Sequence, residues 1–245
     1  MKTNQLIFVL FAASTLVGCK SGDAPDCFKT AGDVSSETRT IEGFLRKVQI
    51  NDEIDVTFIP AEENKVIVKG PEYLIADVVT SQEQGTLQIR NENTCNWVRD
   101  LSIRMEVEVY TTEVEYINYQ GQGDVLFQDT LETDHLTFEN NQGFGDVLIR
   151  FSGDSLTVLN HDYTNIKVIG EARIASFFHQ GSGVFDASEL QAVAVLTNNN
   201  SLNSLYVYPI NYLFAKLTNK GNTYYKGSPE NIDTDISSSG ELLPY

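Results

Sequence analysis

Basic residues, cysteine, proline and tryptophan are scarce in this chain of 245 residues. It has 17 Lys and Arg against 34 Asp and Glu, with 3 Cys, 6 Pro and 1 Trp. The formal net charge of −17 repels phosphates and anionic surfaces, which excludes nucleic acid as a partner. The N-terminal apolar run, residues 6–13, is shorter than the roughly 20 residues that a membrane-spanning helix needs.

Catalytic motifs are also missing. The three histidines, His135, His161 and His179, lie singly in separate segments. His161 and His179 hold similar positions before their turns and could be neighbours, but polar residues at turn edges need no function. There is no Gly-x-Ser-x-Gly elbow and no phosphate-binding loop before a helix. We therefore predict a protein without catalytic residues, metal site or cofactor, and not an enzyme.

Residues 1–18 have the features of a lipoprotein signal peptide. Lys2 provides the positive end, and the apolar run follows it. The sequence Leu16-Val17-Gly18-Cys19 resembles the bacterial lipobox, which is cleaved before its acylated Cys. We expect a mature chain that begins at lipidated Cys19, is anchored to a membrane by its acyl chains and continues as a tether over 19–40. An ordinary secretory signal is the alternative.

Cys27 and Cys95 are the only thiols left once Cys19 carries lipid. Outside the cytoplasm two such cysteines usually oxidise, and the disulfide would add about 4 kcal/mol in the chain-entropy model. We predict a Cys27–Cys95 disulfide. A metal site or a reactive thiol is the alternative, but it lacks His or acidic residues at ligand spacing. Trp97 is expected to pack over this disulfide, with ligand stacking as the other interpretation.

Residues 41–118 are expected to form a leading β-rich section. Alternating apolar residues predict strands around 50–58, 66–68, 87–89 and 103–110. The segment 71–79 differs, because a proline near its start and apolar residues at 74, 75, 78 and 79 favour one short helix.

Residues 119–245 repeat a turn phrase about every twenty residues. The phrase is clearest in Gly121-Gln122-Gly123-Asp124-Val125 and returns at 143–147. Positions two and four residues after its third residue are mostly apolar, which predicts strands with one buried face. Such repeats must stack to bury that face, so we predict an all-β solenoid with inward side chains in columns. The third residues of the phrase are Gly123, Gly145, Thr164, Gly183, Asn203, Gly221 and Gly240, and one predicted column holds Val125, Val147, Ile166 and Leu205.

The acidic residue of the phrase has two interpretations. Stacked carboxylates such as Asp124 and Asp146 could share a calcium ion. Only these two carboxylates are adjacent in the series, however. The alternative is that the glycine takes a positive φ and the following Asp or Asn caps turn amides with its side chain. We favour capping. The turns at 162–165 and 200–204 have lost their glycines, which leaves their backbone geometry open.

These repeats resemble a known bacterial family, the auto-transporter adhesin head domain called the head GIN domain. The similarity rests on the two Gly-x-Gly-Asp-Val phrases, on 181–183 and 221–229, and on the closing 238–242, and it covers roughly residues 41–243. The resemblance implies a right-handed single-stranded β-helix after the leading β-rich section, carried on lipoproteins of Bacteroidetes-like bacteria. It implies adhesion but supplies no binding or catalytic residues.

Aromatic residues of the C-terminal half are the candidates for binding, since several must point away from the core. An outward ladder could stack on sugar rings or contact a protein, or could simply cover solvent-facing strands. The candidate residues are Phe177, Tyr206, Tyr208, Tyr212 and Tyr224.

The predicted function is a non-enzymatic, lipid-anchored protein of the cell envelope. We place it at the outer membrane, facing the periplasm or the surface, with a glycan or protein ligand. One alternative is a carbohydrate-active β-helix enzyme, although the basic residues that acidic sugars require are scattered. Another is a structural module of an envelope complex. The scattered basic residues are Arg150, Lys167, Arg173 and Lys216.

Overall fold

The computed structural model describes residues 32–93 and 104–245. The predictions for the signal peptide, Cys19, the Cys27–Cys95 disulfide and Trp97 lie outside these residues. The elements in chain order are β1 (Val34–Thr40), β2 (Lys47–Asp52), β3 (Asp55–Ile59), β4 (Lys65–Pro71), η3 (Ile75–Asp77), β5 (Val78–Glu83), β6 (Thr86–Asn91), β7 (Glu106–Tyr110), β8 (Tyr116–Gly121), β9 (Val125–Phe127), β10 (Leu131–Glu132), β11 (His135–Asn140), β12 (Asp146–Asn160), β13 (Asn165–His179), β14 (Phe185–Asn199), β15 (Leu205–Leu217), β16 (Thr223–Tyr225), β17 (Asn231–Ile236) and β18 (Leu242–Pro244).

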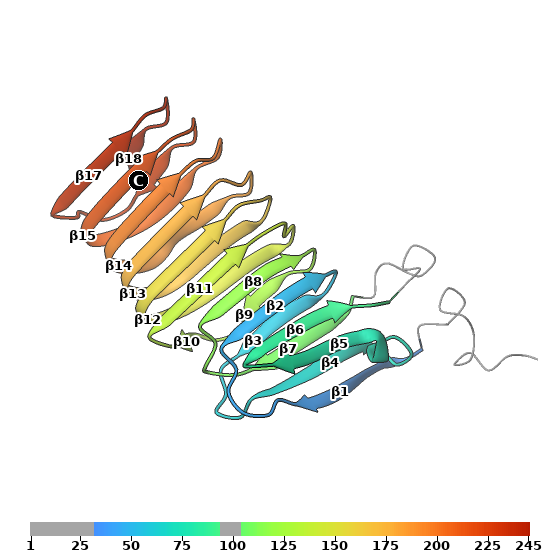
Figure 1. The fold of residues 1–245 in the computed structure, drawn as a ribbon. Coiled ribbons are helices and arrows are strands. Elements are labelled where there is room, and N and C mark those ends of the chain that lie inside the picture. Colours follow the sequence, from blue (N-terminus) through green and yellow to red (C-terminus); the bar gives the residue numbers. More distant parts are fainter. Residues whose placement is uncertain (1–31, 94–103) are drawn as a thin grey trace, which may run out of the picture.

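The strands stack into a β-solenoid of about six turns, which confirms the predicted fold class (Figure 1). Each turn contributes one strand to each of two faces. The long strands β12 to β15 run along both faces and bend between them. The register between neighbouring strands shifts near this bend in β14 and β15. Face 1 consists, in spatial order, of β1, β4, β7, β3, β9, the first halves of β12 to β15, β16 and β18. Face 2 consists of β5, β6, β2, β8, β11, the second halves of β12 to β15, and β17.

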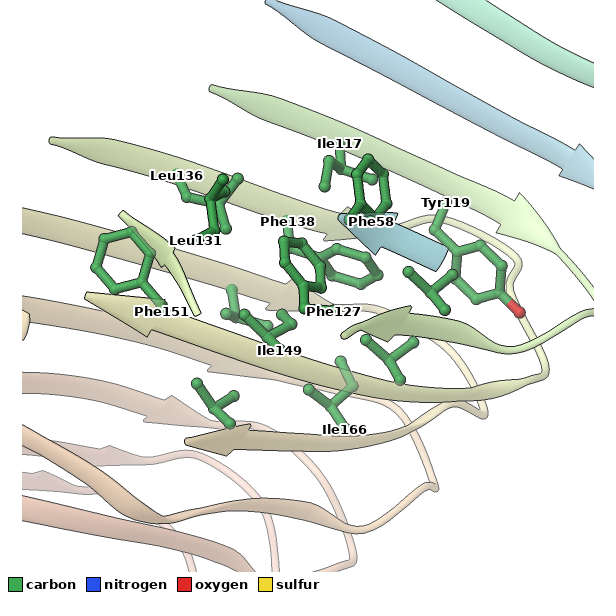
Figure 2. Close-up of a cluster of buried hydrophobic side chains, with 14 of the residues drawn as sticks. Phe58, Ile117, Tyr119, Phe127, Leu131, Leu136, Phe138, Ile149, Phe151 and Ile166 are labelled. Carbon is green, nitrogen blue, oxygen red and sulfur yellow. The ribbon is translucent and has the colours of Figure 1, made fainter. Parts of the chain in front are cut away.

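Inward side chains form columns through the solenoid, as the repeat predicts. Val125 is in register with Val147, Val147 with Ile166, Ile166 with Phe185, and Phe185 with Leu205. All five are buried. The prediction of one column is confirmed. Figure 2 shows the neighbouring cluster between the two faces, in which the rings of Phe58 and Phe127 stack 4.8 Å apart.

The leading section joins the same stack, but out of chain order. Strand β2 lies between β6 and β8, and β3 lies between β7 and β9, all in parallel pairs. Val56 is therefore in register with Val125 and extends the same inward column. Residues 47–59 thus form a turn of the solenoid inserted between turns that follow it in the sequence.

Antiparallel strands close the N-terminal end of the stack. Strand β4 pairs with β7, β1 pairs with β4, and β5 pairs with β6. The segment 71–79, predicted to hold one short helix, contains the three-residue 3₁₀ helix η3 but no α-helix, and Val78 already begins β5. Its apolar residues cover the end of the core as a turn and a strand, because pairing with β6 overrides the local helical pattern. No helix in the described parts of the chain is long and apolar enough to cross a membrane.

Candidate functional site

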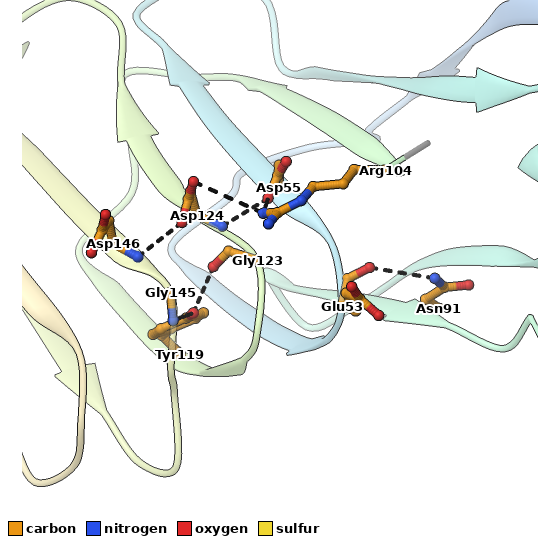
Figure 3. Close-up of polar contacts among 9 residues, drawn as sticks. All are labelled: Glu53, Asp55, Asn91, Arg104, Tyr119, Gly123, Asp124, Gly145 and Asp146. Carbon is orange, nitrogen blue, oxygen red and sulfur yellow. Dashed lines mark hydrogen bonds and ion pairs between the residues drawn. The ribbon is translucent and has the colours of Figure 1, made fainter. Parts of the chain in front are cut away.

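Asp and Asn side chains at the phrase corner of the solenoid, and Asp55 at the equivalent position in the leading section, bind the backbone of the neighbouring turn. The Asp55 Oδ1 accepts the Asp124 backbone N–H at 2.8 Å, and the Asp124 Oδ1 accepts the Asp146 N–H at 2.9 Å (Figure 3). Further along, the Asn165 Oδ1 accepts the Val184 N–H at 2.9 Å. This confirms that the Asp and Asn side chains cap amides, with the amide supplied by the neighbouring turn. The positive φ expected of the phrase glycines is wrong: Gly123 and Gly145 are instead required by close stacking, since a Cβ on either would meet a backbone carbonyl of the preceding turn. No group of three or more His, Cys, Asp or Glu suited to a metal ion is found in residues 32–93 and 104–245.

A second polar column lies inside the same corner. The Tyr119 hydroxyl donates to the Gly123 carbonyl at 2.6 Å and accepts the Gly145 N–H at 2.8 Å. Burial raises the pKa of Tyr119 to about 12, so the hydroxyl keeps its proton. Asn140 continues the column: its Oδ1 accepts the Gly143 N–H at 2.7 Å and its Nδ2 donates to the Asn160 Oδ1 at 2.8 Å. These side chains hold the turns of successive coils together.

The turns without glycine are held by hydroxyl groups. The Thr164 Oγ1 donates to the Gly143 carbonyl at 2.8 Å, and the Ser201 hydroxyl bonds the Gly181 carbonyl. The Ser201 Oγ also accepts the Asn203 N–H at 2.9 Å. The glycine-free turns thus keep their place in the column, because a small hydroxyl residue satisfies the backbone groups that face the interior.

The three histidines do not form a site. His135 is exposed at the start of β11. His161 lies 3.8 Å from Glu139 and contacts the outward ring of Phe178, with ring centroids 5.1 Å apart. His179 points inward and is fully buried, and burial lowers its pKa to about 4, so it is neutral at pH 7. His135 and His161 are thus at the surface at least in part, whereas His179 points into the core.

The titratable cluster around His161 was not predicted from the sequence. The Tyr116 hydroxyl bonds the Glu139 carboxylate beside it on face 2. Burial, with this bond, raises the pKa of Tyr116 to about 12, and the same bond lowers the pKa of Glu139. At pH 7 the Tyr116 phenol is therefore protonated and the Glu139 carboxylate ionised, and the carboxylate also faces His161 at 3.8 Å. The parallel pairing of β8 with β11 brings Tyr116 next to Glu139, which lies two residues beyond its register partner Thr137. The local sequence around either residue does not predict this contact.

Most of the basic residues required by the enzyme alternative are engaged in ion pairs. Lys167 lies 2.6 Å from Glu189, and Lys216 lies 3.0 Å from Asp235. Arg173 pairs with Asp154. These pairs lie on exposed strands and do not converge on one groove, so they provide no cluster that could neutralise an acidic sugar.

The predicted aromatic residues divide between three locations. Phe177 is wrong as a surface residue: it is 3% exposed and packs against Phe185, because alternation along β13 points Phe178 outward instead. Tyr206 and Tyr224 are register partners on face 1, and their rings stack at 5.0 Å and 13°. Tyr208 and Tyr212 are also partly exposed.

Tyr208 and Tyr212 lie on different faces. The Lys226 Nζ lies 5.1 Å from the Tyr208 ring centroid on face 1. The Tyr212 hydroxyl donates to the Asp233 Oδ2 at 2.9 Å on face 2. The sequence pattern therefore identified outward tyrosines but could not group them, since the bend of β15 separates the two positions.

Tyr245 completes the face 1 cluster and was missed in the sequence. Its ring is edge-on to Tyr206 at 5.5 Å and to Tyr224 at 6.5 Å. It is 70% exposed, more than any other ring of the group. We call Tyr206, Tyr208, Tyr224 and Tyr245 the tyrosine cluster. Stacking partly covers the ring faces of Tyr206 and Tyr224. The groups of the cluster that a ligand could contact are therefore the hydroxyls, the ring edges and the ring of Tyr245.

Depressions of the described surface include one on each outer face. The one on face 1, about 530 Å³, has an apolar floor that includes Leu126, Leu148 and Val184, with charged residues at its rim. The smaller one on face 2, about 290 Å³, lies among Phe178 and Phe214 and their neighbours. Neither contains a buried ionisable group suited to chemistry.

The fold and these surfaces define a class: a β-solenoid with a closed N-terminal end and flat outer faces that carry aromatic and apolar groups. The chain belongs to the family described as "Putative auto-transporter adhesin, head GIN domain", which matches residues 44–229. The resemblance stated from the repeats is thereby confirmed. No curated protein sequence matches the chain.

Solved structures of bacterial proteins share the fold. A "putative adhesin" from Bacteroides fragilis superimposes with a TM-score of 0.80 at 19% identity, over 87% of this chain and 97% of that one. A "Putative lipid binding protein" from Parabacteroides distasonis gives 0.68 at 21% identity, over 87% and 97%. A "putative adhesin" from the same species gives 0.64 at 16%, over 87% and 98%. The membership supports an adhesin-like, cell-surface or envelope protein.

Proposed function

We propose that this protein is a lipid-anchored binding module of the bacterial outer membrane, attached through Cys19, whose tyrosine cluster binds a neutral glycan of a surface polymer. It performs no chemistry on that ligand. The observation that carries the proposal is the position of the tyrosine cluster on face 1 at the end of the solenoid opposite β1.

The geometry suits display away from a membrane. Ten strand pairings separate β1 from β18 along face 1, and at about 4.8 Å each they span roughly 50 Å. The predicted anchor precedes β1 in the chain, and the tyrosine cluster lies at the end of the solenoid opposite β1. This supports a role as an adhesin head, because a ligand on another surface would be met by the end that is turned away from the anchor.

The chemistry of the cluster favours sugars without acidic groups. Tyr245 offers an exposed ring on which a sugar ring can stack. The hydroxyls of Tyr206 and Tyr224 can exchange hydrogen bonds with sugar hydroxyls. The net charge of −17 would repel uronic acids, sulfated sugars and phosphate. The ligand class is therefore a neutral glycan.

A glycan array tests this proposal. The mature chain carrying Cys19→Ser would be applied to neutral and acidic bacterial and host glycans. Binding to a neutral glycan should fall at least tenfold in Tyr245→Ala and in the double variant Tyr206→Ala/Tyr224→Ala. The control Tyr73→Ala removes a partly exposed tyrosine of the closed end and should bind as the parent does. Binding to no neutral glycan, or equal binding by all variants, would overturn the proposal.

The anchor has its own test. Cells that express the full chain would be labelled with a palmitate analogue, and the label on the protein should disappear in Cys19→Ala. Retained label would place acylation elsewhere and refute the assignment of Cys19.

A further inference from the structure

The two ends of the solenoid differ in how the core is covered. Strands β1, β4 and β5 close the N-terminal end, but β17 and β18 have no strand beyond them within the described residues. Ile232 and Ile236 are in register with Leu213 and Leu217, which are both 0% exposed. The two isoleucines are 40% and 45% exposed. The inward columns thus end uncovered at β17.

The backbone of β17 has an unused edge. The Ser237 N–H donates to the Leu217 carbonyl at 3.0 Å, which fixes the phase of the ladder with β15. Backbone groups alternate in direction along a parallel strand, so the N–H and C=O of Ile232, Thr234 and Ile236 point away from β15. The edge is six residues long and contains no proline, whereas β18 has three residues and includes Pro244. Strand β17 is therefore the better template for another strand.

The charge beside this edge favours a basic partner. Asp233 and Asp235 point outward on face 2, where Tyr212 and Lys216 each contact a single oxygen of one carboxylate. Two carboxylates thus face one lysine. A second copy of this chain would fit this edge poorly. If two β17 strands paired antiparallel with their isoleucines inward, the outward Asp residues of one strand would lie opposite or nearly opposite those of the other. Like charges in such cross-strand positions repel.

We propose that β17 accepts an extended segment of a partner protein as an added strand. The segment would place apolar side chains over Ile232 and Ile236 and Lys or Arg at alternate positions beside Asp233 and Asp235. Main-chain hydrogen bonds provide the affinity in this binding mode, and the alternating side chains provide the specificity. The surface is separate from the tyrosine cluster, and the inference does not depend on the glycan proposal.

Amide hydrogen exchange followed by NMR tests this mode of binding. The probe is the capped peptide Lys-Val-Lys-Thr-Lys-Val, compared with an analogue in which Glu replaces every Lys. The amides of Ile232, Thr234 and Ile236 should exchange at least tenfold more slowly with the basic peptide, while those of Asp233 and Asp235 are already protected. No slowing, or equal slowing by the acidic peptide, would overturn the proposal.

Two variants separate strand addition from other contacts. Thr234→Pro removes an N–H on the unused edge without touching the bonds to β15, and it should abolish the effect of the basic peptide. Thr234→Val keeps the N–H and should retain that effect. Light scattering provides the last check: a dimer of the parent chain that Thr234→Pro dissociates would show that a second copy occupies the edge, and would refute the proposed partner.

Discussion

His179 should make the stability of the solenoid depend on pH in a way that its neighbours do not. The imidazole is fully buried, in register with Asn160 on one side and Asn199 on the other. Its ring packs edge-on to Phe185 at 5.6 Å. Neither ring nitrogen has a hydrogen-bond partner in the described structure. Burial lowers its pKa from 6.5 to about 4, and the nearby backbone of Gly183 opposes this only in part.

The size of the effect follows from the two pKa values. The unfolded chain takes up the proton near pH 6.5, before the folded chain does, so folding stability falls as the pH falls. The loss from this one group is about 2 kcal/mol between pH 7 and pH 5, and about 3 kcal/mol by pH 4. Below pH 4 both states are protonated and the loss levels off.

The substitution His179→Asn isolates this term, because asparagine already occupies the same column on both neighbouring strands. Urea unfolding of both proteins at pH 7, 6, 5 and 4 gives the free energy of unfolding at each pH. Carboxylates contribute equally to both proteins, so the difference between them reports the histidine. The parent should lose about 3 kcal/mol more than the variant by pH 4. Parallel curves would refute a buried, neutral His179.

Three further predictions concern the corner of the solenoid. Tyr119→Phe leaves two buried backbone groups without partners and should lower the free energy of unfolding by about 2 kcal/mol in urea, whereas Tyr110→Phe on an outer face should cost less than about 1. Asp124→Ala should lower the free energy of unfolding by about 1 kcal/mol, and Asp124→Asn should lower it by less than about 0.5 kcal/mol, because asparagine keeps the acceptor oxygen. A rise in the Tm of the parent protein with calcium chloride would instead favour a cation site at Asp124. Gly183→Ala pushes a Cβ into the Thr164 carbonyl and should lower the free energy of unfolding by about 3 kcal/mol in urea. The control Ser182→Ala should change it by about zero in the same assay. A small effect at Gly183 would show that the turns are not tightly stacked.

The repeat was predictable because each copy of the turn phrase and its flanking apolar residues lies within a short stretch of sequence. Val125 and Val147 have the same neighbours and the same alternation, and each buries the same face, so their column follows from the spacing alone. The glycine-free turn at Thr164 also keeps that spacing. Its hydroxyl bond to Gly143, however, joins residues 21 apart and could not be read from either turn by itself.

The aromatic surface was predictable only in part. Tyr206 and Tyr224 were identified because the aromatic residues of this half of the chain alternate or stand in pairs, so that some of them must point away from the core. The pair Phe177-Phe178 offered two equally hydrophobic choices, and the register of β13 with β12 and β14 decided which ring faces the core. Tyr245 directly follows β18, and the parallel pairing of β18 with β16 on face 1 brings its ring to those of Tyr206 and Tyr224.

The sequence by itself determined the solenoid, its inward columns and its family, because a side-chain period of two within a repeat of about twenty residues can bury its apolar side only by stacking. Only the tertiary structure decided that residues 47–59 insert out of order, that antiparallel strands close one end, and that β17 leaves the other end open. Those features depend on pairings between distant segments, and many strands of similar alternation could have paired there. Their order is set by how the whole chain packs, which no single stretch of sequence contains.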